Sequence, residues 1–156
     1  ERAAAGGSPA AHRFPRTFLH GDGLDFSFSG LKTAVRYALA PQGTDPAEAR
    51  PTPQQIADLA AGFQEAVIDV LVAKAAAALQ RTGRNVLCVG GGVAANGRFR
   101  ARLEASVQSA SARVIVAPRE LCTDNAVMGA IAWERLQAGL VEPLDLDVVA
   151  GLQRGS

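Results

Sequence analysis

The most regular hydrophobic pattern lies just before the middle of the chain. Thr52, Pro53 and Gln55 form a capping-box sequence with proline at the first helical position. Gly83 stands where a glycine C-cap belongs. Between these signals, apolar side chains recur at about the 3.6-residue period of an α-helix, at Ile56, Leu59, Phe63, Val67, Val70 and Leu71. The pattern predicts an amphipathic helix from Pro53 to Arg81.

An alternation of strands and helices follows this helix. The predicted elements are a strand over 85–89, a helix over 96–109, a strand over 113–117 and a helix over 123–138. Phe99, Leu103 and Val107 share one face of the first of these helices. Pro118 ends the second strand, and Gly139 ends the last helix. This order predicts an α/β fold with a mostly parallel sheet flanked by helices.

The first third of the chain is less regular. Leu24–Ser29 alternates apolar and polar residues and predicts a half-buried strand, and 31–40 predicts a helix. The Pro- and Gly-rich stretches 8–24 and 41–53 predict loops. Residues 1–7 resemble the end of a helix that stops on glycines, and residue 1 is Glu. We therefore expect the chain to be a fragment that begins within an element.

Composition limits the classes of protein that fit. The 156 residues suit one domain or one lobe of a larger enzyme, and 48% of them are hydrophobic, enough for a real core. The 16 Lys and Arg nearly balance the 15 Asp and Glu, which neither favours nor excludes a nucleic-acid partner. No apolar run approaches the roughly 18 residues of a membrane span. Cys88 and Cys122 form no CxxC motif, so we expect a reducing cytoplasm.

A glycine turn, Gly90–Gly92, joins a predicted strand to a predicted helix N-terminus. Glycines let a ligand approach the backbone, and helix N-termini favour anions such as phosphate. Asn96 suits either an N-cap or a hydrogen bond to a ribose or base. A packing turn with an Asn cap is the alternative, so the pattern alone leaves the ligand open.

The same turn matches a dinucleotide-binding fingerprint at Gly90, Gly92 and Ala95. That fingerprint requires an acidic residue about 20 positions on, at the end of the next strand. The nearest candidate is Glu120, which comes late and lies beyond Pro118. A Rossmann-type NAD-binding domain therefore remains as an alternative.

A second polar segment, 119–125, follows the next predicted strand. The carboxyl edge of a parallel sheet is the usual ligand crevice of α/β folds. Asp124 offers a hard oxygen donor for a metal, although Thr123, Asp124 and Asn125 are also ordinary N-cap residues. Cys122 is more typical of a small buried apolar residue than of a ligand.

Arginines are frequent in the second half of the chain. Arg98 and Arg102 share a helix face, and Arg100 is predicted to pair with Glu104 at the i, i+4 spacing. Such a cluster suits either nucleic-acid phosphates or simple solvation of a helix.

Three blocks of the sequence, in order, resemble one family. Residues 24–33 read LDFSFSGLKT, residues 89–96 read VGGGVAAN, and residues 122–126 read CTDNA with Met128 in place. They are similar to the LDFSFSGLKT, GGVxAN and CTDNxxM blocks of the tRNA N6-adenosine threonylcarbamoyltransferase family (TsaD/Gcp, formerly the glycoprotease family). The match places residues 1–143 in the C-terminal part of such a protein, with 144–156 as an irregular tail and the N-terminal half absent.

The resemblance implies a fold and an activity. It implies the actin-like, two-lobed ATPase fold with ribonuclease-H-like halves. It also implies transfer of threonylcarbamoyl from threonylcarbamoyl-AMP to N6 of adenosine 37 in tRNAs that read ANN codons. TsaB-like and TsaE-like partner proteins, tRNA as substrate, a cytoplasmic location and no membrane association follow from the same resemblance.

The resemblance also assigns roles to residues. Gly91, Gly92 and Asn96 would contact the adenine nucleotide, which is threonylcarbamoyl-AMP or ATP. Asp124 would be one ligand of a divalent metal, iron or alternatively zinc. Residues that act directly in the chemistry are not assigned.

One departure from the family pattern bears on activity. The family's other metal ligands form an HxxxH pair, and this sequence has only His12 and His20, eight positions apart. We expect the remaining ligands to come from the absent half, and these 156 residues alone to be inactive. A non-catalytic adenine-nucleotide-binding lobe is the alternative from another class.

Overall fold

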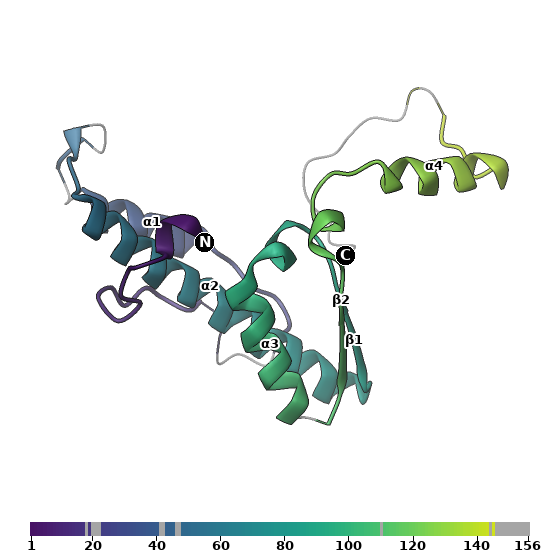
Figure 1. The fold of residues 1–156 in the computed structure, drawn as a ribbon, viewed down its shortest axis with the longest axis horizontal. Helices are drawn as coiled ribbons and strands as arrows, with labels where there is room; N and C mark the ends of the chain where they lie inside the picture. The colour runs from purple at the N-terminus through teal and green to yellow at the C-terminus, as the bar shows by residue number, and fades with distance from the viewer. Residues whose placement is uncertain are drawn as a thin grey trace. The chain divides into compact units, whose positions relative to one another are not determined.

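The computed structural model describes residues 1–17, 19, 23–40, 43–45, 48–109, 111–143 and 145. The chain divides into two compact units, Glu1–Thr123 and Asp124–Ser156, and each is described by itself. The first unit contains η1 (Arg2–Ala4), α1 (Ser29–Leu39), α2 (Pro53–Thr82), β1 (Val86–Val89), η3 (Gly92–Ala95), α3 (Gly97–Ser109), β2 (Arg113–Val116) and η4 (Arg119–Leu121), and the second contains α4 (Val127–Gln137) (Figure 1).

The long helix α2 forms as its flanking sequence predicts. The backbone N–H of Gln55 donates to Thr52 Oγ1 at 3.2 Å, and the Thr52 N–H donates to Gln55 Oε1 at 2.8 Å. These two bonds complete the capping box, with Pro53 at the first helical position. Gly83 ends the helix in the left-handed conformation at φ 61°. The prediction is confirmed, with the last helical residue at Thr82.

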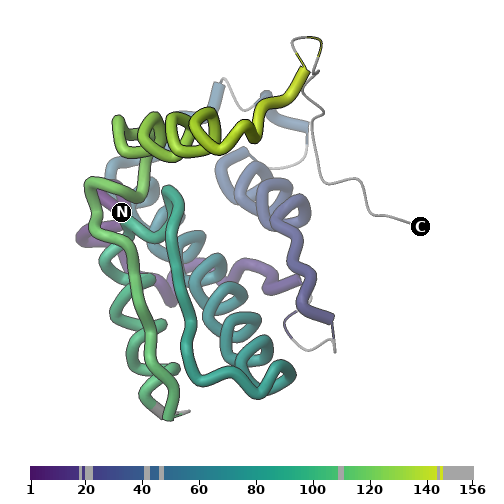
Figure 2. Tube along the Cα trace, turned by 90° about the vertical axis from the view of Figure 1, so that its right-hand side faces the viewer, coloured from purple at the N-terminus to yellow at the C-terminus, as the bar shows by residue number. Residues whose placement is uncertain are grey.

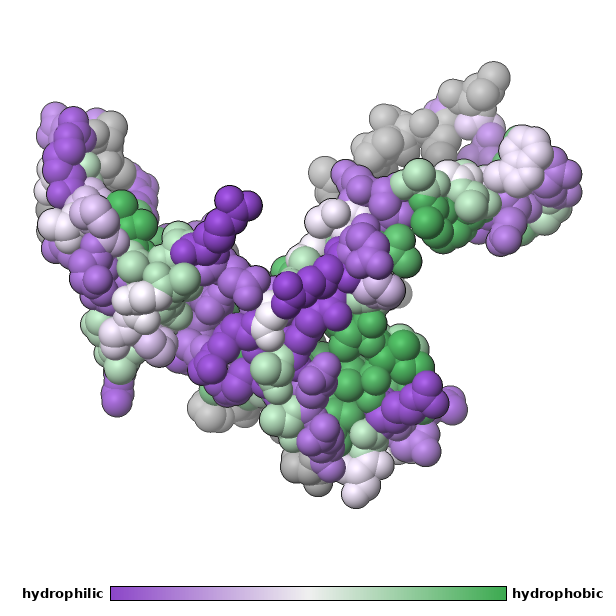
Figure 3. Space-filling model, viewed as in Figure 1, coloured by the Kyte–Doolittle hydropathy of each residue, from purple (hydrophilic) through white to green (hydrophobic). Residues whose placement is uncertain are grey.

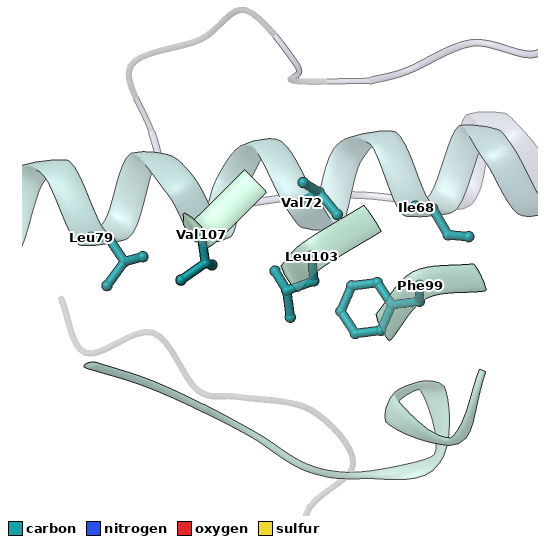
Figure 4. Packing of buried hydrophobic residues seen from close by; sticks show 6 residues of the cluster. All are labelled: Ile68, Val72, Leu79, Phe99, Leu103 and Val107. Atoms are coloured by element: carbon teal, nitrogen blue, oxygen red, sulfur yellow. The ribbon is translucent and has the colours of Figure 1, made fainter. Parts of the chain in front are cut away.

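The core of the first unit has two parts, both built on α2. In one cluster, side chains from α2 and α3 face each other (Figure 4), namely Ile68, Val72, Leu79, Phe99, Leu103 and Val107. The predicted apolar face of α3 is confirmed, and Leu103 is only 1% exposed. In the other cluster, Leu59 and Ala66 of α2 pack against Leu31 of α1 and Phe14 of the preceding loop.

The predicted apolar stripe of α2 is only partly buried. Ile56 and Phe63 remain 45% and 38% exposed, although they belong to the stripe. The reason is that α2 contacts α1 and α3 with different faces along its length, as Figure 2 shows. A single stripe therefore does not describe a helix packed between two neighbours.

The sheet of the first unit consists of β1 and β2, which pair in parallel. The register places Val86 opposite Arg113 and Val89 opposite Val116. The crossover between the strands contains α3, which packs on the same core as the sheet. The α/β class and the parallel pairing are thus confirmed for the described residues.

The two faces of this sheet differ in their environment. Leu87, Val89 and Val114 pack against the cluster between α2 and α3. Val86 and Ile115 alternate with them and are 45% and 43% exposed. Figure 3 shows an apolar surface over the two strands. Helices of the first unit therefore cover one face of the sheet and leave an apolar face open.

One predicted strand is wrong. Residues 24–28 have no strand pairing, and α1 begins at Ser29 directly after them. Phe26 and Phe28 lie with their ring centroids 5.5 Å apart. A strand needs a neighbour to accept its backbone hydrogen bonds, and β1 and β2 pair with each other instead.

The last helix begins later than predicted. It starts at Val127 rather than Thr123 because Asn125 Oδ1 accepts a hydrogen bond from the Val127 N–H at 3.0 Å. This side chain-to-backbone turn is typical of Asn just before a helix. Gly139, at φ 70°, follows the helix as predicted.

Within the described part of the chain, no helix is both long and apolar enough to cross a membrane.

Of the two predicted chain ends, the structure describes only the first in full. The predicted helical end over residues 1–7 is a 3-10 turn, η1, followed by Gly6 at φ 87°. The predicted irregular tail 144–156 lies outside the described residues except for Asp145.

The N-terminal loop is held to α2 by a carboxylate, and we expect this contact to depend on pH. The Ser8 backbone N–H donates to Asp58 Oδ1 at 2.7 Å, and Gln54 Nε2 donates to the same oxygen at 3.0 Å. The Ser8 bond, followed by the Gln54 bond, lowers the pKa of Asp58 from its ordinary value of 3.8. A lowered pKa means that the contact is complete above the ordinary value and is lost as pH falls through the folded value.

The measurement is the Ser8 amide resonance followed from about pH 6 to about pH 2. We expect it to move only in the acid part of this range. Asp58→Asn keeps the oxygen acceptor but cannot titrate, so its Ser8 resonance should stay constant. The same acid transition in both proteins would contradict the assignment.

Candidate nucleotide-binding site

Two loops meet at one edge of the sheet. The glycine turn, which from here on includes η3 and means residues 90–96, follows β1, and the segment 117–122 follows β2. Parallel strands place their carboxyl ends at the same edge. The short helices within these loops, η3 and η4, contact each other. The structure therefore brings the first predicted site next to the first residues of the second, those in η4.

The glycine turn has the geometry of a backbone open to a ligand. Gly91 adopts φ 85° and ψ 170°, a conformation that strains any residue with a side chain. A Cβ atom at Gly90 or Gly92 would meet no atom within 4 Å. Packing within the described residues thus gives no reason for glycine at these two positions. Their lack of side chains leaves the peptide groups accessible.

Asn96 is held by both ends of its amide. Its Oδ1 accepts from the Phe99 N–H at 2.9 Å and caps α3. Its Nδ2 donates to Gln64 Oε1 of α2 at 2.9 Å. An amide nitrogen has two hydrogens to donate, so one remains for a ligand. The structure thus confirms that Asn96 caps α3. The remaining amide hydrogen is compatible with the alternative that Asn96 also binds a ligand.

A cavity of about 340 Å³ lies beside Asn96. That volume is within the range of small-molecule sites, about 300–1,000 Å³. Its walls come from α2, the glycine turn, the start of α3 and the N-terminal turn. The lining residues are Glu1, Ala4, Ala60, Phe63, Gln64, Val67, Ile68, Gly92, Val93, Asn96 and Phe99. A mostly apolar wall with amides at its edge suits a flat heterocycle that carries a polar substituent.

A carboxylate occupies the N-terminus of α3. Glu1 Oε1 accepts from the Gly97 N–H at 3.1 Å, and Glu1 also lines the cavity. Helix N-termini favour negative charge. The carboxylate oxygens of Glu1 take the place that an anionic group such as a phosphate would take there. The contact shows that the Gly97 N–H at the start of α3 can bind a carboxylate oxygen.

Arg100 connects the two loops instead of pairing with Glu104. Its Nε donates to Ala94 O at 2.5 Å, and its Nη2 donates to Ala117 O at 2.6 Å and to Cys122 Sγ at 3.3 Å. The predicted ion pair at the i, i+4 spacing is wrong for the described residues. The carbonyl groups at the ends of both loops lie within reach of the guanidinium and bind it instead.

The other arginines of α3 bind carboxylates of α2. Arg98 Nε lies 2.6 Å from Glu65 Oε1, and Arg102 bridges Glu65 at 2.8 Å and Asp69 at 2.9 Å. Arg16 completes the network with a 2.9 Å contact to Asp69. Glu65 raises the pKa of Arg98 above its ordinary value. The predicted shared face of Arg98 and Arg102 is confirmed, and its role here is to join α3 to α2.

Asp124, the predicted metal ligand, is the first residue of the second unit and is exposed. Among the described residues, no group of three or more His, Cys, Asp or Glu gathers as a metal site.

Cys122 is 2% exposed, and its Sγ donates to the carbonyl of Pro118 at 3.3 Å. The prediction of a buried, apolar Cys122 is confirmed. Glu120 lies in η4, beyond the end of β2, so it does not take the place of the dinucleotide fingerprint's acid.

Sequence reasoning missed two residues at this site. Gln64 and Glu1 contact the Asn96 segment from 32 and 96 positions away along the chain. No periodicity or motif reports a contact over such separations. Only the packing of α2 and η1 against the start of α3 reveals them.

Comparison with known proteins identifies the family. A family model described as TsaD: tRNA N6-adenosine threonylcarbamoyltransferase matches residues 1–131. A tRNA N6-adenosine threonylcarbamoyltransferase of Rhodopirellula baltica is 46% identical over 97% of this chain and 45% of its own length. One of Polaromonas naphthalenivorans is 47% identical over 96% of this chain and 40% of its own length. The chain thus spans less than half the length of these curated relatives. It belongs to the TsaD family of tRNA N6-adenosine threonylcarbamoyltransferases.

Proposed function

We propose that this chain is the nucleotide-binding part of an enzyme that transfers threonylcarbamoyl from threonylcarbamoyl-AMP to N6 of adenosine 37. The substrates are tRNAs that read ANN codons. The observation that carries the proposal is the cavity beside Asn96, bordered by the open backbone of Gly91 and Gly92. Family membership supports the reaction, because both relatives carry the name of this transferase.

The cavity suits the AMP portion of the substrate. The apolar wall that includes Phe63 and Val67 would hold the adenine, and the free Nδ2 hydrogen of Asn96 would bind a polar atom of the base or ribose. The N–H groups of the glycine turn would receive the phosphate, as helix N-terminal loops commonly do. The same contacts would stabilise AMP as it leaves during transfer, and ATP is an alternative ligand.

The complete enzyme would have the actin-like, two-lobed ATPase fold, with a ribonuclease-H-like lobe formed by this chain. The parallel β-α-β unit and its single open apolar face support this fold, since a second layer would cover that face. Sequence beyond these residues would supply the other lobe.

A divalent metal, iron or alternatively zinc, would be held by Asp124 together with ligands from outside this chain. The exposed Asp124 carboxylate is a suitable oxygen donor. One carboxylate alone does not make a transition-metal site, so the described residues do not fit the metal by themselves. No step of the reaction is derived through it.

The proposed partners follow from the proposed reaction. They are tRNA as substrate and TsaB-like and TsaE-like proteins, in the cytoplasm. A second candidate function is a non-catalytic lobe that binds adenine nucleotides. The incomplete metal donor set among the described residues favours it for this chain taken alone.

Titration calorimetry of the chain with AMP, GMP, NAD and nicotinamide mononucleotide tests the proposed site. We expect AMP to bind, GMP to bind at least about tenfold more weakly, and nicotinamide mononucleotide not to bind. NAD should bind no more tightly than AMP, because only its adenosine part fits the cavity. NAD binding far tighter than AMP binding would instead support the Rossmann-type alternative.

A further inference from the structure

Arg100 differs from the other arginines of α3 in what it binds. Its guanidinium donates to the carbonyl oxygens of Ala94 and Ala117 and to the sulfur of Cys122. The structure shows no ion pair between Arg100 and a carboxylate among the residues it describes. Arg98 and Arg102, on the same helix, both bind Glu65.

These partners argue against the alternative that Arg100 only solvates the surface of the helix. Arg100 is only partly exposed, and a partly buried charge is costly without compensating bonds. Glu104 stands one helical turn away and would provide an ion pair at the surface. The guanidinium instead binds neutral carbonyl groups, and charge-assisted bonds to such groups are short and strong.

The two carbonyl groups belong to different loops. Ala94 lies in η3, within the glycine turn that borders the cavity. Ala117 follows β2 and begins the loop that contains η4. A planar guanidinium holds its donors in a fixed geometry, so one side chain fixes the distance between the turn and the loop.

The loop that Arg100 contacts is also held by hydrogen bonds of its own. The Cys122 thiol is 2% exposed and donates to the Ala117 and Pro118 carbonyls. The backbone N–H groups of Leu121 and Cys122 donate to Pro118 O and Arg119 O at 3.0 and 3.2 Å. A shift of Ala117 would therefore move the whole segment 117–122, which ends two residues before Asp124 in the sequence.

We propose that Arg100 is a positioning residue that couples the glycine turn to the loop leading to Asp124. A ligand that binds at the turn would then stabilise the observed position of segment 117–122, and that position would in turn strengthen binding, because one guanidinium contacts both. Coupling of this kind is reciprocal between the two sites. The coupling of the two loops stands on the described contacts alone, and its link to nucleotide binding rests on the proposed function.

Backbone amide exchange of the complete chain, followed by NMR, tests the proposal. The reporters are hydrogen-bonded amides in the two segments, those of Ala94 and Asn96 in the turn and of Leu121 and Cys122 in the loop. Arg100→Lys keeps the charge and the aliphatic stem but loses the fork. Arg98→Lys, on the same helix, is the matched control, because a lysine can still pair with Glu65.

Without ligand, we expect Arg100→Lys to accelerate exchange at all four reporters by about tenfold and to leave the amides of α2 unchanged. Arg98→Lys should leave all of them unchanged. Acceleration in one segment only, or equal acceleration throughout the first unit, would overturn the proposal.

With AMP added to the wild-type chain, exchange should slow at Leu121 and Cys122 as well as in the turn. In Arg100→Lys the slowing should be confined to the turn, and AMP affinity should fall about five- to tenfold. Slowing confined to the turn in the wild type would contradict the coupling. If AMP changes no amide in the wild type, the proposed nucleotide site has failed, and the ligand-free comparison still decides the role of Arg100.

Discussion

Replacement of Asn96 by Ala should weaken AMP binding by at least about tenfold, which corresponds to one good hydrogen bond of roughly 1.4 kcal/mol. The structure explains the size of this effect. The Asn96 amide lines the cavity, and one of its Nδ2 hydrogens remains free while Gln64 fixes the orientation of the group. The variant should also lose about 1 kcal/mol of stability, because the cap on the Phe99 N–H disappears. Calorimetry and urea unfolding measure the two quantities.

Two further variants separate binding from capping. Asn96→Asp keeps an oxygen acceptor for the Phe99 N–H but has no amide donor. Asn96→Ser caps about as well as Asn and is neutral, so its result excludes charge repulsion as the cause. We expect both variants to keep the wild-type stability within about 0.5 kcal/mol and to lose AMP affinity. Wild-type affinity in Asn96→Ser would show that the amide does not touch the nucleotide.

Local signals predicted most of the described helices and strands. The ends of α2 were correct to one residue because Thr52, Gln55 and Gly83 act within a single turn of the chain. The buried face of α3 was predicted correctly because the helical spacing of Phe99 and Leu103 is enough to indicate an apolar face. Such signals do not depend on what lies elsewhere in the sequence.

Predictions failed where the outcome depended on distant partners. Residues 24–28 have the alternation of a strand, but no strand pairs with them in the described part of the chain. Arg100 has a suitable acid one turn away and binds carbonyl groups brought near by the sheet instead. Both differences come from tertiary contacts that overrule a local preference.

The residues of the candidate site also fall into two groups, those that the sequence indicated and those that depend on distant contacts. The glycines and Asn96 stood out in the sequence because a strand, a glycine turn and a helix start are consecutive. The wall of the cavity did not, because Phe63 and Val67 come from the middle of α2. The role of Asp124 as a metal ligand stays a prediction.

We propose that this chain forms a threonylcarbamoyl-transfer site only together with the lobe supplied by the rest of such a protein. In the proposed site, Asp124 would contribute one metal ligand and the other lobe would contribute the rest. A change at Asp124 should therefore abolish transfer by the complete assembly, whereas Glu120→Ala, at a nearby exposed acid, should not. Asp124→Ala should leave AMP binding by the chain itself intact, since the residues that line the cavity all belong to the first unit.

The most direct measurement is transfer to a tRNA that reads ANN codons, with threonylcarbamoyl-AMP supplied and the modified nucleoside quantified by mass spectrometry. The chain is tested alone and together with the part of the Rhodopirellula baltica relative that it does not match. We predict no transfer by the chain alone, transfer by the mixture, and none by the mixture with Asp124→Ala. Transfer by the chain alone, or undiminished transfer with Asp124→Ala, would contradict the account.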